Sequence, residues 1–145
     1  TIENFHGLPH RLQVVSKYKK RIFINDSKST NIDSCRTALE SFSSKVILLM
    51  GGRDKGFPYT SLKELTKKKV KYIIAFGEAK EKINRDLSSF CKVYLSVTLK
   101  EAVNKAFKIS KEYDTILLSP ACSSFDEFKN FKERGKAFCQ YIKKL

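Results

Sequence analysis

Three short polar segments of the sequence carry residue types that can bind anions and donate hydrogen bonds. They read "NDSKSTN" (25–31), "GGRDKG" (51–56) and "SPACSSFD" (119–126), and each one follows or ends a run of apolar residues. Lysine ammonium groups attract phosphates and carboxylates, and serine and threonine hydroxyls add directed hydrogen bonds. These segments are therefore candidates for a site that binds a phosphate or a carboxylate.

The segment "GGRDKG" also has a purely structural interpretation. Paired glycines let the backbone approach a ligand closely, and Lys55 in such a loop is a point charge for phosphate or carboxylate. The same residues suit a glycine turn between a strand and a helix that leaves Lys55 exposed. A Walker A phosphate loop is excluded, because Phe57 follows Gly51-x-x-x-x-Gly56 where that motif needs Lys-Ser/Thr.

The other two polar segments have helix-capping alternatives. Thr30 or Asn31 could cap the helix that follows. That role leaves Asp26 and Lys28 unexplained. Ser124 lies three residues before a glutamate, which is the spacing of a capping box at the start of the last helix. Because a helix start also presents free backbone N–H groups to anions, a cap and a ligand site are compatible there.

Six apolar runs predict the strands of a sheet. Two short runs joined by a polar turn are typical of a hairpin. Most later runs are continuous rather than alternating, which indicates strands covered on both faces. The predicted strands cover residues 11–17, 20–25, 45–52, 70–77, 91–96 and 113–120.

Segments with helical periodicity separate the later strands. Thr98 and Glu101 form a predicted capping box before one such segment, and Ser61 and Glu64 have the same spacing. In the final segment, Phe131 lies on an apolar stripe that favours core packing. The predicted helices cover residues 32–42, 61–69, 78–90, 98–110 and 126–144.

Strands that alternate with helices of these lengths require crossovers and a mostly parallel sheet. The predicted fold class is Rossmann-like α/β, with helices on both faces and the first hairpin as a candidate antiparallel edge. Residues 1–145 form a single domain in this interpretation. In open sheets of this type ligands bind where strands end and helices begin, so the topology could gather the three polar segments at one edge.

The composition indicates a folded, basic domain. The chain has 145 residues, of which 41% are hydrophobic, and a formal net charge of +14. The lysines are spread along the whole sequence without an RNP-like motif, zinc-finger spacing or arginine-rich arm, which favours a solvated surface over nucleic-acid binding. No apolar run approaches the roughly 20 residues of a membrane span, so we expect a cytoplasmic protein with no membrane partner.

Neither the cysteines nor the histidines predict a metal site. The four cysteines are widely spaced and lack a C-x-x-C pair, which favours reduced, structural thiols. Cys122 has no histidine or other base nearby in the sequence and is expected to be buried. His6 and His10 lack partner ligands at metal-binding spacing, so no metal ligand is predicted in this chain.

Taken in order, four motifs resemble the C-terminal domain of the Mur ligases of peptidoglycan synthesis. They are F-x-G-L-P-H-R (5–11), N-D-S-K-x-T-N (25–31), G-G-x-x-K (51–55) and L-L-S-P-A-C-x-S-x-D-x-F-x-N-F-x-x-R-G (117–135). The second motif is similar to that of the family members that add D-glutamate, whereas related ligases tend to carry an Asp-x-x-His-x-Pro type sequence there. The resemblance implies a ligase that activates UDP-N-acetylmuramoyl-L-alanine with ATP to an acyl phosphate, which D-glutamate attacks.

The resemblance also implies roles for individual residues. The residues expected to contact D-glutamate are Thr30, Lys55, Ser124 and Phe131. Those expected to face the nucleotide are Arg11, Asp26 and Lys28. Of these, Arg11 and Lys28 have the catalytic role of neutralising charge on the transferring phosphoryl group. Gln13 and Tyr18 depart from the family pattern and leave the adenine and ribose contacts open.

The resemblance implies that this chain acts with further domains. It begins with Thr and lacks the G-K-S/T phosphate loop of the family's central domain, so we expect a fragment of a three-domain enzyme. ATP and Mg²⁺ are the expected cofactors, with Mg²⁺ bound mainly by the central domain, and the fragment is predicted to be inactive alone. The alternatives are a freestanding nucleotide-binding module and a basic nucleic-acid-binding domain.

Overall fold

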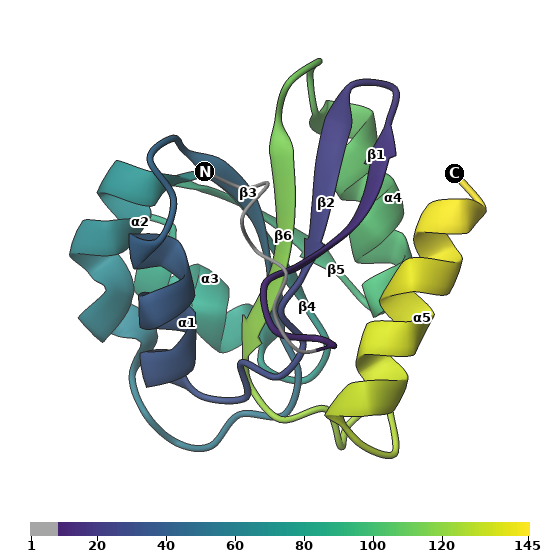
Figure 1. The fold of residues 1–145 in the computed structure, drawn as a ribbon. Coiled ribbons are helices and arrows are strands. Elements are labelled where there is room, and N and C mark those ends of the chain that lie inside the picture. The colour runs from purple at the N-terminus through teal and green to yellow at the C-terminus, as the bar shows by residue number, and fades with distance from the viewer. Residues whose placement is uncertain (1–8) are drawn as a thin grey trace.

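The computed structural model describes residues 9–145, and the strands in this range form a single twisted sheet (Figure 1). The strands are β1 (Gln13–Tyr18), β2 (Arg21–Asn25), β3 (Val46–Gly51), β4 (Val70–Phe76), β5 (Lys92–Ser96) and β6 (Thr115–Ala121). Their order across the sheet is β1-β2-β6-β3-β4-β5, and every neighbouring pair is parallel except β1 and β2. The predicted parallel sheet with an antiparallel edge hairpin is confirmed.

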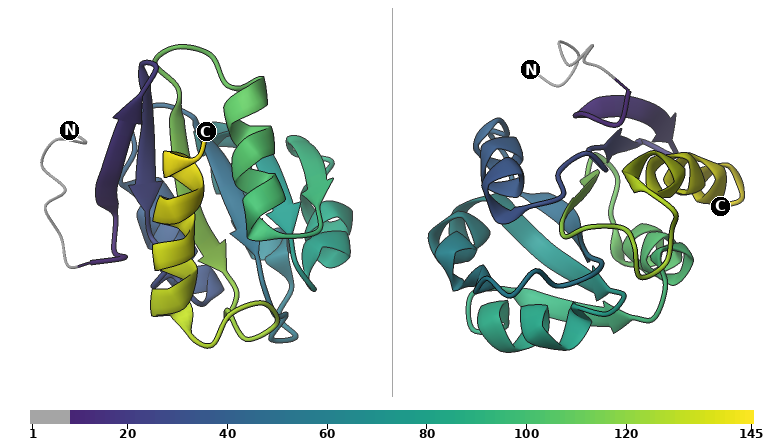
Figure 2. Two further views of the ribbon diagram at one scale, coloured as in Figure 1. Left: turned by 90° about the vertical axis from the view of Figure 1, so that its right-hand side faces the viewer. Right: turned by 90° about the horizontal axis from the view of Figure 1, so that it is seen from below.

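Helices cover both faces of the sheet, as the two views of Figure 2 show. They are α1 (Ile32–Glu40), the short 3-10 helix η2 (Tyr59–Leu62), α2 (Lys63–Lys69), α3 (Lys80–Leu87), α4 (Leu99–Ile109) and α5 (Phe131–Lys143). The first four of these pack on one face, and α4 and α5 pack on the other. None of the helices in residues 9–145 is long and apolar enough to cross a membrane.

The two-sided core explains why the apolar runs are continuous. Side chains of successive strand residues point to opposite faces of a sheet. In β3, Leu48 and Met50 join the core under α1 and α3, while Ile47 and Leu49 join the core under α4 and α5. Every residue of β3 is therefore buried.

Two of the predicted helix caps are correct. Asn31, rather than Thr30, caps α1, because its side chain accepts a hydrogen bond from Ser34 N (2.8 Å). Thr98 caps α4 by accepting from Glu101 N (3.2 Å). The Thr30 hydroxyl is thus not part of the cap of α1.

Two other predicted caps are wrong. The last helix begins at Phe131 instead of residue 126, and Asn130 caps it, so Ser124 does not. The reason is tertiary, because the residues before the helix cross the edge of the sheet. There the carboxylates of Asp126 and Glu127 accept hydrogen bonds from the backbone of Glu78 and Leu99. Similarly, Ser61 does not cap α2, because the 3-10 turn η2 precedes that helix and the Ser61 hydroxyl donates to Pro58 O (3.5 Å).

Candidate functional site

The three polar segments meet at the carboxyl edge of the sheet, where the adjacent strands β2, β6 and β3 end. Ala121 N donates a hydrogen bond to Ser29 O (2.9 Å), and Arg53 N donates one to Ser123 O (3.0 Å). A Cβ atom at Gly52 would lie 2.2 Å from Ser123 O, so this close approach requires glycine. The backbone after β6 is therefore bonded to both other loops.

A buried arginine on α5 joins two of these loops. Arg134 is fully buried, and its guanidinium donates to Ser27 Oγ (3.0 Å), Ser27 O (2.8 Å) and Cys122 O (3.0 Å). Burial lowers the pKa of Arg134 to about 10, which still leaves it charged near neutral pH. Sequence reasoning assigned Arg134 no role. The indication in the sequence was that Arg134 directly precedes Gly135, which lies on the apolar stripe of the last helix.

Asp26 is the buried polar centre of the loop after β2. One carboxylate oxygen accepts from Leu12 N (3.1 Å), and the other accepts from the hydroxyls of Ser119 (2.8 Å) and Ser29. Burial raises the pKa of Asp26 above its ordinary value, although these donors and the charge of Arg11 act in the opposite direction. The carboxylate thus holds the segment before β1, the loop after β2, and β6 together.

A cavity of about 310 Å³ opens beside Asp26. Its lining includes Arg11, Asp26 and Lys28, with Ser34 and Thr37 from α1. The cavity therefore brings together the three residues that the sequence predicted to face a nucleotide. Arg11 and Lys28 are exposed there, so their charges are accessible to an anion.

The residues predicted to contact D-glutamate lie around the neighbouring loops. Lys55 is exposed and lines a second, smaller cavity of about 40 Å³ together with Asn31 and Ala121. Ser29 lines the larger cavity and Asn31 lines the smaller one, so Thr30 stands in the sequence between a residue of each cavity. Because Asn31 and Lys55 line the same cavity, the loops that carry Thr30 and Lys55 lie next to each other.

The remaining two predicted residues come from the chain after β6. Ser124 is buried, and its main-chain carbonyl accepts from the backbone N–H groups of the next turn. Phe131 begins α5, where its carbonyl accepts from Ser27 Oγ (2.7 Å) and its half-buried ring meets the His10 ring edge-on at 6.5 Å. Phe131 therefore packs against the loop after β2, and neither residue lines the two cavities.

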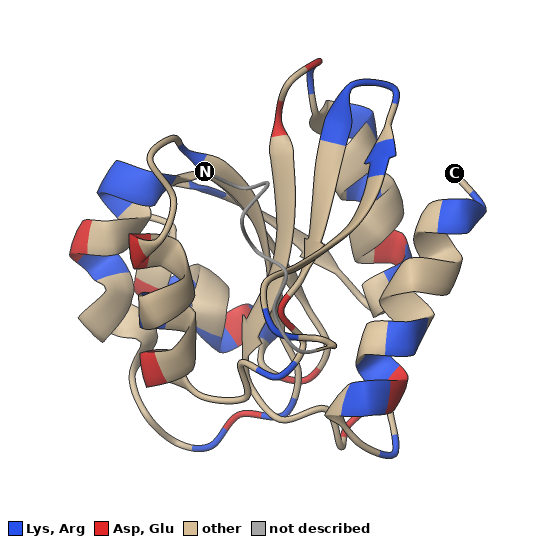
Figure 3. Ribbon diagram, in the orientation of Figure 1, with Lys and Arg blue, Asp and Glu red and all other residues tan. Residues whose placement is uncertain are grey.

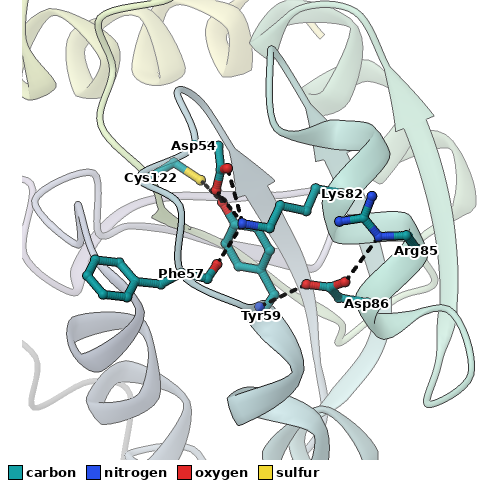
Figure 4. Close-up of polar contacts among 7 residues, drawn as sticks. All are labelled: Asp54, Phe57, Tyr59, Lys82, Arg85, Asp86 and Cys122. Atoms are coloured by element: carbon teal, nitrogen blue, oxygen red, sulfur yellow. Dashed lines mark hydrogen bonds and ion pairs between the residues drawn. The ribbon is translucent and has the colours of Figure 1, made fainter.

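A cluster of polar side chains holds the loop after β3 (Figure 4). The Lys82 ammonium from α3 lies 3.2 and 3.1 Å from the two carboxylate oxygens of Asp54, and donates to Phe57 O (2.9 Å). The Tyr59 hydroxyl donates to Asp54 (2.9 Å) and lies 3.1 Å from Cys122 Sγ. Burial opposes ionisation of Asp54, but the hydrogen bonds from Lys82 and Tyr59 and the Lys82 charge lower its pKa.

His10 packs into a gap that a glycine leaves on α5. A Cβ atom at Gly135 would lie 2.2 Å from His10 Nδ1. Asn25 Nδ2 lies 3.0 Å from the same nitrogen and donates to Gly135 O (3.2 Å). Burial, with the charges of Lys136 and Lys132, lowers the pKa of His10 and favours the neutral ring. The other histidine, at position 6, and residues 5–8 of the first motif lie outside the described residues.

Comparison with known proteins gives matches along the whole chain. The family model described as "Mur ligase, glutamate ligase domain" matches residues 10–122. The UDP-N-acetylmuramoylalanine--D-glutamate ligase of Bdellovibrio bacteriovorus is 47% identical over 144 residues, which are 99% of this chain and 31% of that protein. The ligase of the same name from Bacteroides fragilis is 39% identical over 146 residues, 99% of this chain and 33% of that protein. The chain thus spans about a third of the length of these relatives.

Solved structures of low sequence identity share the fold. A bifunctional folylpolyglutamate synthase/dihydrofolate synthase from Yersinia pestis has a TM-score of 0.68 at 13% identity, covering 96% of this chain and 32% of that one. A MurF ligase from Thermotoga maritima in complex with ADP has a TM-score of 0.65 at 16% identity, covering 97% of this chain and 33% of that one. These similarities confirm the predicted α/β fold class.

Proposed function

This chain belongs to the Mur ligase family, whose glutamate ligase domain it matches, and we propose that it is part of an ATP-dependent ligase that adds D-glutamate to UDP-N-acetylmuramoyl-L-alanine. The observation that carries the proposal is the 47% identity over nearly the whole chain to a relative named for D-glutamate ligation. In such a ligase ATP converts the substrate carboxylate to an acyl phosphate, and the amine of D-glutamate displaces the phosphate.

We assign the larger cavity to the nucleotide side of the reaction. Arg11 and Lys28 would neutralise the charge that spreads over the phosphoryl oxygens during transfer, which is mainly a task of positioning and electrostatics. Asp26 would support both by fixing the segments that carry them, since its oxygens accept hydrogen bonds from three protein groups. Mg²⁺ binding would need ligands from outside this chain, because one carboxylate so occupied does not hold the ion.

We assign the loops after β2, β3 and β6 to the amino acid. D-Glutamate has two carboxylates, so it needs a fixed cation, for which Lys55 is suited, and directed donors such as the Thr30 and Ser124 hydroxyls. Phe131 would form part of the wall of the amino-acid site. The hydrogen bonds between these loops support the assignment, because they hold groups from distant parts of the sequence in one place.

We propose that catalysis needs the remainder of a longer protein. No G-K-S/T phosphate loop occurs in these 145 residues, and the relatives are about three times as long as this chain. Separate N-terminal and central domains would supply the UDP site, the phosphate loop and most of the Mg²⁺ ligands. The 145-residue chain alone is expected to form no ligation product.

The decisive test is a ligation assay with the longer protein that carries this chain. UDP-N-acetylmuramoyl-L-alanine and ATP are supplied with D-glutamate, L-glutamate, L-lysine or diaminopimelate, and ADP release and product mass are measured. We expect product with D-glutamate alone. Product with another amino acid in place of D-glutamate, or none with any of them, would contradict the proposed function.

Two variants test the division of the site within the same assay. Lys55→Ala should raise KM for D-glutamate about 10- to 100-fold, which is the usual effect of losing a charge-assisted hydrogen bond. Lys28→Ala should mainly lower kcat. Lys68→Ala is the control, because Lys68 is exposed at the end of α2. Normal kinetics in both test variants would show that the site assignment is wrong.

A further inference from the structure

The geometry of the loop after β3 assigns a new role to Lys82, which we propose is a positioning residue for the amino-acid site. This inference rests on the proposed function, in which Lys55 binds D-glutamate. The Lys82 ammonium bonds to residues on both sides of Lys55 in the chain. It pairs with the carboxylate of Asp54 at 3.1 Å and donates to the carbonyl of Phe57 at 2.9 Å.

The loop needs such a contact because its own side chains contribute little packing. Lys55, Gly56 and Phe57 are all exposed, and the Phe57 side chain is 66% exposed. Gly56 has a φ of +90° and no atom within 4 Å of the place where a Cβ would lie. Apolar burial therefore does not select one conformation of this loop. Glycine adds conformational freedom, so polar contacts at the ends of the loop decide where Lys55 stands.

Two contact partners of Lys82, Asp54 and Tyr59, are themselves held by other groups. Tyr59 is 1% exposed, and its hydroxyl donates to Asp54 (2.9 Å) while lying 3.1 Å from Cys122 Sγ in the chain after β6. The Lys82 ammonium lies over the Tyr59 ring, 5.3 Å from its centre (Figure 4). The Lys82 and Asp54 side chains are only 22% and 29% exposed, so water weakens their attraction less than at a free surface.

Loss of this contact should affect binding of the amino acid more than the chemical step. Without Lys82, Asp54 and Phe57 lose the ammonium group that both of them bind. The loop then adopts more conformations, and Lys55 is less often in the position that binds a carboxylate. Arg11 and Lys28 line the larger cavity, whose lining does not include Lys82. A rise in KM for D-glutamate with little change in kcat distinguishes this role from general loss of structure.

The test uses Lys82→Met in the longer protein that carries this chain, with initial rates measured across D-glutamate concentrations. We expect KM for D-glutamate to rise about twofold to fivefold, as for loss of a half-buried ion pair, and kcat to stay within about twofold. Lys82→Arg should restore much of the affinity, because a guanidinium can donate to both acceptors. Asp54→Asn, which removes the charge but keeps the shape, should raise KM in the same way.

A matched control exists at the opposite edge of the sheet. Lys71 pairs with Asp114 at 3.3 and 3.1 Å, with side chains 31% and 17% exposed, and Lys71→Met should leave both constants unchanged. Unchanged KM in Lys82→Met and Asp54→Asn, with normal D-glutamate ligation by the wild type, would overturn this inference alone. Equal rises in KM for Lys71→Met and Lys82→Met would also overturn it. A wild type that does not use D-glutamate would overturn the proposed function and this inference together.

Discussion

Two arginines at opposite edges of the sheet make the same pattern of hydrogen bonds. At the carboxyl edge, Arg134 binds the hydroxyl and the carbonyl of Ser27 and one further carbonyl. At the amino edge, Arg21 binds the hydroxyl and the carbonyl of Ser110, each at 2.9 Å, and the carbonyl of Lys19 at 2.8 Å. Arg134 is fully buried, whereas Arg21 is only half-buried. Burial, rather than the bonding pattern, distinguishes the two edges.

The more basic edge of the sheet is the amino edge, whereas the candidate anion site lies at the carboxyl edge. Figure 3 shows lysines and arginines gathered at the turn between β1 and β2 and at the last turns of α2 and α5, on the amino side of the sheet, with few acidic residues among them. Charge density therefore does not mark the candidate site; buried polar groups that join several loops do.

The largest expected difference between the edges is in the cost of losing an arginine. Arg134→Met leaves buried oxygens of Ser27 and Cys122 without donors and should lower the free energy of unfolding by about 3 kcal/mol. Arg21→Met should cost only about 1 kcal/mol, because water can reach the freed acceptors of Ser110 and Lys19. Urea unfolding of this chain, followed by circular dichroism, measures both values. Equal losses would show that burial is not what separates the two edges.

Sequence reasoning predicted the elements well because their signals are local. Each strand is a short apolar run, and the caps at Asn31 and Thr98 depend on residues three positions away. It failed for Ser124, because Asp126 and Glu127 accept hydrogen bonds from Glu78 N (3.0 Å) and Leu99 N (3.2 Å) and so hold the chain across the sheet edge. A contact between distant elements overrides a local capping pattern.

The candidate site was predictable only in part for the same reason. The resemblance pointed to Arg11, Asp26 and Lys28, and the fold places them in one cavity. Lys82 had no such signal, and Arg134 had only its place beside Gly135 in the last motif. Their partners lie 28 residues away at Asp54 and 107 residues away at Ser27. The gathering of lysines at the amino edge was hidden in the same way, since they are scattered in the sequence.

A smaller effect is expected when the matched ion pairs are broken. Lys82→Met and Lys71→Met should each lower the free energy of unfolding by about 0.5 to 1 kcal/mol, because both pairs are half-buried and have similar distances. The two variants should thus be equal in stability while differing in D-glutamate KM. Thermal and urea unfolding of this chain tests the first half of that statement. A much larger loss for Lys82→Met would mean that the contact stabilises the whole fold.

The pH dependence of stability gives a further contrast at the carboxyl edge. The pKa of Asp26 is raised above 3.8 in the folded chain, so the folded state keeps its proton at pH values where the unfolded state has lost it. The contribution of Asp26 to stability is therefore full below pH 3.8 and is lost as the pH rises through the folded-state pKa. Asp26→Asn should remove this fall. Urea unfolding of both chains from about pH 3.5 to about pH 7 should give curves that diverge with pH; parallel curves would contradict the prediction.

The smallest effect is expected at the most highly charged surface. Lys67, Lys68 and Lys69 end α2, where a cation gains about 0.3 to 1 kcal/mol from the helix dipole but is repelled by its basic neighbours. Because these contributions oppose each other, Lys68→Gln should change the free energy of unfolding by less than about 0.5 kcal/mol. Raising the salt concentration should reduce even that difference, since exposed charges are screened. A loss of 2 kcal/mol or more at Lys68 would mean that the amino edge, like the carboxyl edge, depends on specific polar contacts, because dipole attraction alone cannot supply so large an effect.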